Sequence, residues 1–205
     1  MDVIKGIDQG TPEWHALRRG VITASKFKDV MAKGQGKTRE SYLYDLLLER
    51  TTDIVQESYT NEYMEWGTEC EPLARHEYEI SSGVEVEEIT FVKQSDTVGC
   101  SPDGFVGTDG MLEIKSPASK TQIMRYFKEI GLPPEYKAQV QGQLWVCERD
   151  WCDFLSYDPR VPDAARFICT RVFRDDKYIL ELSKVVSDFT AELLDKEKEL
   201  TSEGF

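Results

Sequence analysis

The chain has few of the residues that build disulfide frameworks and histidine-rich metal sites. Among 205 residues it has five cysteines, an odd number without a Cys-x-x-Cys pair, and two histidines. This usage argues against paired disulfides and structural zinc, so we expect buried or half-buried thiols. No eighteen apolar residues occur in a row, and the first residues lack the basic and apolar segments of a signal peptide. We therefore expect a cytoplasmic protein without a membrane span.

Basic residues are also scarce, and the net charge is −13. A strongly acidic chain argues against a nucleic-acid substrate, because binding of phosphates normally requires a basic surface. The charges are segregated, however: residues 15–40 carry seven bases, whereas residues 53–88 carry eleven acids and the single base Arg75. The basic segment could bind DNA, while the acidic remainder of the chain aids solubility. The alternative is an ordinary solvated mixture of charges.

The hydrophobic content of 40% suffices for one sizeable core, and no low-complexity linker divides the chain, so we expect a single domain over residues 1–205. Apolar periodicity and capping residues predict helices, strands, further helices, two more strands and a final helix. This order predicts an α/β fold with a mixed central β-sheet flanked by helices. The expected helices are a short one that starts at 11–13, then 23–32, 41–50, 61–80, 120–129, 134–147 and one from 176. The expected strands are 84–92, 97–100, 104–106, 111–114, 151–157 and 166–173.

Two carboxylates and an ammonium group are the most informative feature. Asp103 precedes a short apolar run, and Glu113 and Lys115 belong to a second run after a glycine-containing turn. The two runs can pair as a hairpin, which brings Asp103 close to Glu113. Because side chains alternate along a strand, Glu113 and Lys115 share one face while Ile114 points into the core.

Carboxylate oxygens of this kind suit Mg2+, with Mn2+ as a possible substitute, and such an ion can activate water and hold a scissile phosphate. Lys115 would orient or deprotonate that water, or neutralise developing charge. The pattern therefore indicates a metal-dependent phosphodiesterase, and a nuclease in particular. The alternative is that Asp103 belongs to a simple turn and that Glu113 and Lys115 form a solvated stripe on an amphipathic strand.

Several segments in a fixed order resemble the phage lambda exonuclease family of YqaJ-like viral recombinases, in the PD-(D/E)XK nuclease superfamily. They are Trp14-His15-Ala16-Leu17-Arg18, Gly20-Val21-Ile22-Thr23-Ala24-Ser25, Trp66-Gly67 with Glu71, Ser101-Pro102-Asp103-Gly104, Glu113-Ile114-Lys115, and Ala138-Gln139-Val140-Gln141. The resemblance spans roughly residues 13–160 and is more specific than any one pattern.

The resemblance implies a restriction-endonuclease-like core and a metal-dependent deoxyribonuclease. Its activity would be Mg2+-dependent, processive 5′→3′ digestion of one strand of linear double-stranded DNA from a 5′-phosphorylated end. The products would be 5′-mononucleotides and a 3′ single-stranded overhang for annealing-type phage recombination. The implied partners are two further copies of the chain, in a homotrimer ring, and a single-strand annealing protein, in the cytoplasm of a bacterial host. Alternatives are a related nuclease of different polarity or endonucleolytic action, and a non-catalytic DNA-binding subunit.

Residue by residue, the resemblance makes Asp103 and Glu113 metal ligands and Lys115 the catalytic lysine. It also implies that the main-chain carbonyl of Ile114 and the carboxylate of Glu71 bind the metal, and that Gln139 contacts water or phosphate near it. The implied pocket for the 5′-terminal phosphate contains Arg18, Ser25 and Ser101, whose guanidinium and hydroxyl groups match phosphate oxygens.

Two further DNA contacts are expected from the basic loop and the start of the long helix. Relatives place an arginine near position 35, where this chain has Gln35, so we expect Lys33, Lys37 or Arg39 to contact the DNA backbone instead. Met64, just before Trp66, would help to part the strands at the duplex end; the alternative is an ordinary buried methionine.

Overall fold

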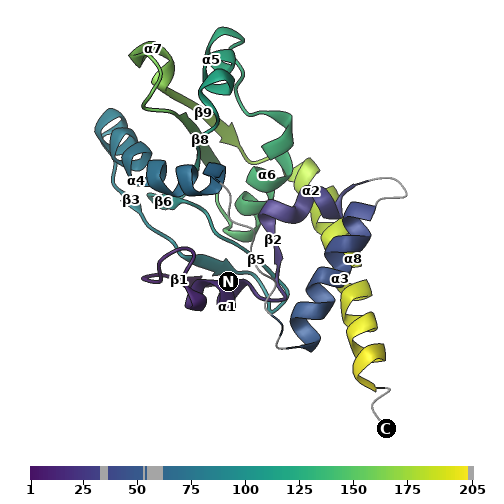
Figure 1. Ribbon diagram of the computed structural model, residues 1–205. Coiled ribbons are helices and arrows are strands. Elements are labelled where there is room, and N and C mark those ends of the chain that lie inside the picture. Colours follow the sequence, from purple (N-terminus) through teal and green to yellow (C-terminus); the bar gives the residue numbers. More distant parts are fainter. Residues whose placement is uncertain (33–36, 53, 55–61, 203–205) are drawn as a thin grey trace.

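Two mixed β-sheets with helices around them form the fold of the described residues, which are 1–32, 37–52, 54 and 62–202 of this computed structural model (Figure 1). The first sheet has the order β1-β4-β5-β2 and the second has the order β3-β6-β7-β8-β9. The strands are β1 (Asp2–Ile4), β2 (Ile22–Thr23), β3 (Val86–Glu87), β4 (Phe91–Lys93), β5 (Val98–Cys100), β6 (Gly104–Val106), β7 (Gly110–Lys115), β8 (Trp151–Tyr157) and β9 (Phe167–Phe173).

The helices include two short 3-10 turns. They are α1 (Pro12–Arg18), η1 (Ala24–Lys26), α2 (Phe27–Val30), α3 (Lys37–Thr51), α4 (Glu62–Ser82), α5 (Ser119–Phe127), η2 (Pro134–Tyr136), α6 (Lys137–Val146), α7 (Asp163–Arg166) and α8 (Asp176–Ser202). The first of them begins as the sequence predicts, since the Thr11 side chain accepts a hydrogen bond from the Trp14 amide and Pro12 occupies the first helical position.

The five-stranded sheet is covered on both faces. On one face, Cys70, Ala74 and Tyr78 of α4 pack against Leu112, Ile114 and Leu155 of the sheet. On the other face, Met111 and Phe154 join the larger core that α2, α3, α6 and α8 share. Strands β7 and β8 pair in parallel at the centre, whereas β3, β6 and β9 run antiparallel to their neighbours. The expected α/β class with mixed sheets flanked by helices is therefore confirmed.

Two expected elements differ in the structure. The helix expected from Thr23 is interrupted, because Thr23 belongs to β2, where it pairs with Gly99 of β5, and its side chain does not cap a helix. A 3-10 turn and the four-residue α2 follow instead. The single strand expected over 84–92 is split between the two sheets. Between its halves, the Thr90 hydroxyl accepts from the Ile7 amide and donates to the Ile7 carbonyl, which directs the chain toward β1.

Four of the five cysteines are buried as expected, whereas the fifth is not. Cys70, Cys100, Cys147 and Cys152 are buried free thiols, and Cys169 is exposed on β9. The sulfur atoms of Cys100 and Cys147 lie 3.4 Å apart. Within the described part of the chain, no helix has the length and apolar character needed to cross a membrane.

Candidate nuclease active site

The predicted hairpin forms and positions the two central carboxylates. Strands β6 and β7 are antiparallel with Gly104 opposite Leu112, and the Asp103 amide donates to the Leu112 carbonyl at 3.2 Å. The Ile114 amide donates to Oδ2 of Asp103 at 2.5 Å. Asp103 therefore lies at the end of the hairpin beside Glu113, and the turn at Gly107 has a φ of 59°, which favours glycine.

Glu113 lies in the interior, with 1% of its surface exposed, and both of its carboxylate oxygens accept hydrogen bonds. Lys115 Nζ and Gln139 Nε2 each lie 2.5 Å from Oε1, and Gln143 Nε2 lies 2.7 Å from Oε2. As the strand alternation predicts, Glu113 and Lys115 share a face, whereas Ile114 packs under α4. The interpretation of Glu113 as part of a solvated surface stripe is therefore wrong.

Glu71 approaches the same cavity from α4 but is held by a cation. Arg75 Nη2, one helical turn later, lies 2.6 Å from Glu71 Oε1 and 3.3 Å from the Asp103 carbonyl oxygen. Nη1 of Arg75 lies 2.9 Å from Oε2 of Glu88. Arg75 therefore links three acidic segments, and its i, i+4 spacing from Glu71 is the sequence signal that could have indicated this pairing.

Burial and the nearby charges shift the pKa values of Asp103, Glu71 and Lys115. Burial, and then the charges of Glu113 and Glu71, raises the pKa of Asp103 well above its ordinary value. Burial also raises the pKa of Glu71, although Arg75 opposes this shift. For Lys115, burial lowers the pKa, but the charges of Glu113 and Asp103 outweigh it and raise the pKa above its ordinary value. Lys115 is therefore charged at neutral pH.

Three carboxylates that line the cavity, Glu71, Asp103 and Glu113, offer the oxygen donors that a divalent cation prefers. Among the described residues, no three His, Cys, Asp or Glu side chains converge as a ready-made metal centre. Lys115 and Arg75 instead neutralise Glu113 and Glu71. The donors still fit a hard cation, because carboxylate oxygens of the half-buried Asp103 and the buried Glu113 face one cavity. After burial, the charge of Glu113 is the largest cause of the raised pKa of Asp103.

The residues assigned to the 5′-phosphate pocket lie in the same cavity. Its volume is about 650 Å³, and its lining includes Arg18, Ser25, Met64, Glu71, Ser101, Asp103, Glu113, Lys115 and Gln139. Arg18 Nη1 donates to the Ser101 hydroxyl at 2.9 Å, and its guanidinium carbon lies 4.4 Å from the Trp14 ring centroid. The Ser25 hydroxyl lies 3.3 Å from that of Thr23. The predicted metal, catalytic and phosphate residues thus share one cavity, except Ile114, which is not among the lining residues.

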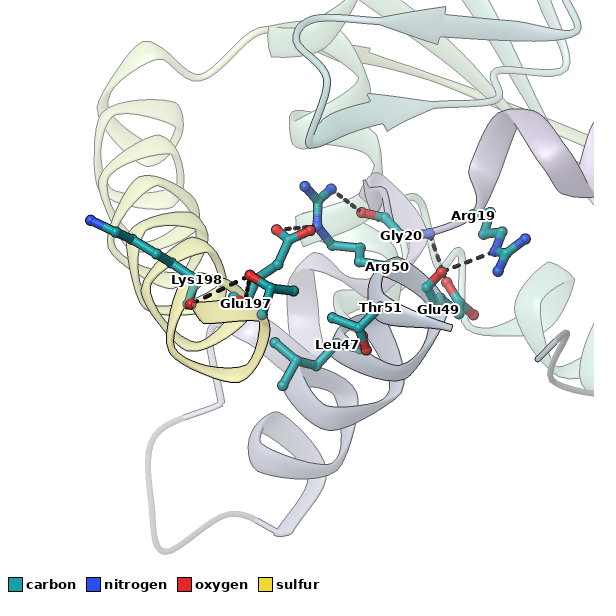
Figure 2. Close-up of polar contacts among 9 residues, drawn as sticks. Arg19, Gly20, Leu47, Glu49, Arg50, Thr51, Glu197 and Lys198 are labelled. Atoms are coloured by element: carbon teal, nitrogen blue, oxygen red, sulfur yellow. Dashed lines mark hydrogen bonds and ion pairs between the residues drawn. The ribbon is translucent and has the colours of Figure 1, made fainter. Parts of the chain in front are cut away.

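The turn that carries Arg18 is fixed by α3. The Arg19 Nε donates to the Glu49 carbonyl at 2.9 Å, and the Gly20 amide donates to the Glu49 carboxylate at 2.8 Å. Arg50 then donates to the Gly20 carbonyl at 3.2 Å and to Glu197 of α8 at 2.8 Å (Figure 2). Both main-chain groups of Gly20 are therefore bonded by neighbouring side chains of one helix.

The remaining expected DNA contacts have different outcomes. Lys33 and Gln35 lie outside the described residues. Lys37 is an exposed residue at the start of α3 and is not among the residues that line the cavity. Arg39 forms an ion pair with Glu192 of α8 at 2.7 Å. Met64 is 51% exposed and lines the cavity, so its interpretation as a buried methionine is wrong.

The fold and the site together define the class. Paired strands carry Asp103 and Glu113-Ile114-Lys115, and a covering helix adds a third carboxylate, as in α/β nucleases with a restriction-endonuclease-like core. Residues 13–150 match the YqaJ-like viral recombinase domain, and the chain belongs to that family. The resemblance seen in the sequence is thereby confirmed.

Three similar proteins extend this match. The alkaline exonuclease LHK-Exo from Laribacter hongkongensis is 40% identical, with a TM-score of 0.87 over 94% of this chain and 97% of that chain, and its complex with dAMP matches equally. A phage related exonuclease from Haemophilus somnus 129PT, 15% identical over 92% of this chain and 98% of that chain, shares the fold with a TM-score of 0.64. Uncharacterized protein R354 of Acanthamoeba polyphaga mimivirus is 31% identical over 173 residues, in a match that covers 76% of this chain but 30% of that protein.

Proposed function

We propose that the protein is a Mg2+-dependent exonuclease that digests one strand of linear double-stranded DNA, 5′→3′, from a 5′-phosphorylated end. The observation that carries this proposal is a single cavity that holds both the carboxylate and lysine cluster and the Arg18–Ser101 pair. A scissile phosphodiester beside Lys115 and a terminal phosphate beside Arg18 would belong to the same strand end. Each cut would release a 5′-mononucleotide and leave a 3′ overhang.

The residues of the hairpin would supply the hydrolytic chemistry. A divalent cation held by Asp103, Glu113 and the Ile114 carbonyl would polarise the phosphodiester and lower the pKa of a water molecule. Lys115, whose Nζ lies 2.5 Å from Glu113 Oε1, would neutralise negative charge at the phosphate or orient or deprotonate the attacking water. Gln139 would orient Glu113 and the attacking water, since its amide already contacts that carboxylate.

The Arg18 pocket would supply direction. Its guanidinium is oriented by stacking on Trp14 and by the Ser101 hydroxyl, so it is preorganised for a phosphate. After each cleavage the new 5′-phosphate would bind in this pocket, and its binding free energy would favour forward movement of the enzyme. This coupling is a physical basis for processivity.

The relatives support the same activity. LHK-Exo is an alkaline exonuclease and has been crystallised with dAMP, a deoxynucleoside monophosphate of the type that we propose as the product here. From the family we further propose a homotrimer ring around DNA, a single-strand annealing protein as partner, and a role in phage recombination in the bacterial cytoplasm. Light scattering after size-exclusion chromatography tests the trimer.

The deciding experiment compares linear duplexes with 5′-phosphate or 5′-hydroxyl ends, together with a covalently closed circle, in Mg2+ or in EDTA. We expect mononucleotides from the linear substrates in Mg2+, faster from the phosphorylated ends, and no cleavage of the circle. Asp103→Asn serves as the inactive control, because it removes a charged ligand and keeps the side-chain shape. Digestion in EDTA, cleavage of the circle, or release only from 3′ ends would contradict the proposal.

A further inference from the structure

Gln143 is a buried residue that sequence analysis did not single out and that contacts both halves of the cavity. It lies on α6, one helical turn after Gln139, and 1% of its surface is exposed. Its Nε2 donates to Glu113 Oε2 at 2.7 Å and lies 3.4 Å from the Ser101 carbonyl oxygen. It therefore connects the predicted metal ligand to the segment that carries the Arg18 partner.

The amide oxygen of Gln143 has a second informative property. Oε1 is buried and has no hydrogen-bond partner among the described residues, although the side chain lines the cavity. A buried acceptor without a donor costs free energy, and native proteins usually satisfy such groups with protein, water or ligand. The hydrogen bonds described for Gln143 therefore all involve its amide nitrogen.

We infer that Gln143 is a positioning residue that holds the Glu113 carboxylate in the orientation needed to bind the divalent cation. Through its contact with the Ser101 carbonyl, Gln143 would also fix the distance between the Glu113 carboxylate and the 5′-phosphate pocket. The inference rests on the proposed function. It differs from the role assigned to Gln139, whose amide contacts the other carboxylate oxygen, Oε1, alongside Lys115.

The physical argument concerns the two oxygens of one buried carboxylate. Without Gln143, Glu113 Oε2 would lose the donor given by its 2.7 Å contact, whereas Oε1 would keep Lys115 and Gln139. The carboxylate would then rotate toward these remaining donors and away from the cation. Removal of residues that orient a metal ligand typically lowers metal affinity or activity about 10–100-fold.

Gln141 provides a matched control on the same helix. It is also a buried glutamine with two hydrogen bonds, donating to the Phe173 carbonyl at 2.9 Å and accepting from the Asp175 amide at 2.8 Å, away from the cavity. Gln141→Met and Gln143→Met therefore remove similar groups from similar surroundings. Gln143→Asn is a third variant, which stays polar but is one methylene too short to reach Glu113.

The first measurement is Mn2+ binding to the full chain without DNA, in which electron paramagnetic resonance reports the concentration of the free ion. We expect Gln143→Met and Gln143→Asn to bind Mn2+ about 10–100-fold more weakly than the parent, and Gln141→Met to bind within twofold of it. Circular dichroism identifies any variant that does not fold, and the asparagine variant decides the question if the methionine variant fails. Equal Mn2+ affinity in the parent and in a folded Gln143 variant would overturn the inference.

The second measurement is the ratio of digestion rates on 5′-phosphorylated and 5′-hydroxyl ends at saturating Mg2+. A lower ratio in the Gln143 variants supports the link through Ser101, and an unchanged ratio overturns that link. Failure of the proposed function would look different, because the parent itself would then bind no Mn2+ or digest no DNA. That result would overturn both the function and the role of Gln143.

Discussion

Arg50 offers a test of how the fold positions the phosphate pocket from a distance. Its guanidinium bonds the carbonyl of Gly20, two residues after Arg18, and forms an ion pair with Glu197. We predict that Arg50→Met lowers stability and also reduces the preference for 5′-phosphorylated ends, because the turn that carries Arg18 loses one of the three hydrogen bonds described between it and α3.

The magnitude follows from the two contacts. A charged hydrogen bond to the Gly20 carbonyl contributes about 1.5 kcal/mol, and the partly exposed pair with Glu197 contributes about 0.5 kcal/mol. The loss of about 2 kcal/mol should lower the melting temperature by roughly 4–8 °C for a chain of this size. If the Arg18 turn loses a similar part of its positioning, the end preference should fall about tenfold, which corresponds to about 1.4 kcal/mol.

Glu197→Gln is the control, because it removes the ion pair and leaves the bond to Gly20 (Figure 2). We expect it to lower the melting temperature by roughly 1–2 °C and to leave the end preference unchanged. Differential scanning calorimetry and initial rates on matched 5′-phosphate and 5′-hydroxyl duplexes give the two readouts. The reasoning is refuted if Arg50→Met and Glu197→Gln have the same end preference as the parent.

Three further predictions concern single side chains. Arg18→Ala should slow digestion of 5′-phosphorylated ends more than that of 5′-hydroxyl ends, and an equal loss on both substrates would remove its assigned role. Lys115→Met should lower the rate constant at saturating Mg2+ at least about 100-fold with an unchanged circular dichroism spectrum; a loss below tenfold would argue against a catalytic lysine. Burial by itself raises the pKa of Asp158, but hydrogen bonds from Arg160 and Ser119 outweigh it and lower the pKa. The resulting stability is present above the unfolded pKa of about 3.9 and is lost as the pH falls through the lower folded value, so urea denaturation of Asp158→Asn should vary less between pH 4 and 2 than that of the parent.

Sequence patterns predicted the long, periodic elements of the fold well. Strand β8 has the expected bounds, and α4 and α8 lie where apolar periodicity and capping residues indicated. Patterns could not predict β1, β2 or α7, because two to four residues give no periodic signal. The split between β3 and β4 depends on contacts of Thr90 with Ile7, which is 83 residues away in sequence.

The hairpin of the candidate site was predictable because Asp103 and Glu113 are local partners with a glycine turn between them. The third carboxylate and the phosphate pocket came from the family resemblance, since the distance in sequence from Arg18 to Ser101 gives no local indication of their contact. The sequence patterns did not indicate Arg75 or Gln143, although they lie one helical turn after the predicted site residues Glu71 and Gln139. Helical spacing around a candidate ligand is therefore worth inspecting for its supporting residues.

The crowded acidic groups at the cavity have a consequence for engineering the protein. Replacing Asp103 with asparagine, a neutral residue of the same shape, would relieve repulsion from Glu113 and Glu71 in the ion-free chain, and so would raise its heat resistance while destroying the chemistry. Selection for thermal robustness alone would therefore enrich inactive molecules, and a useful screen must score melting and DNA digestion together.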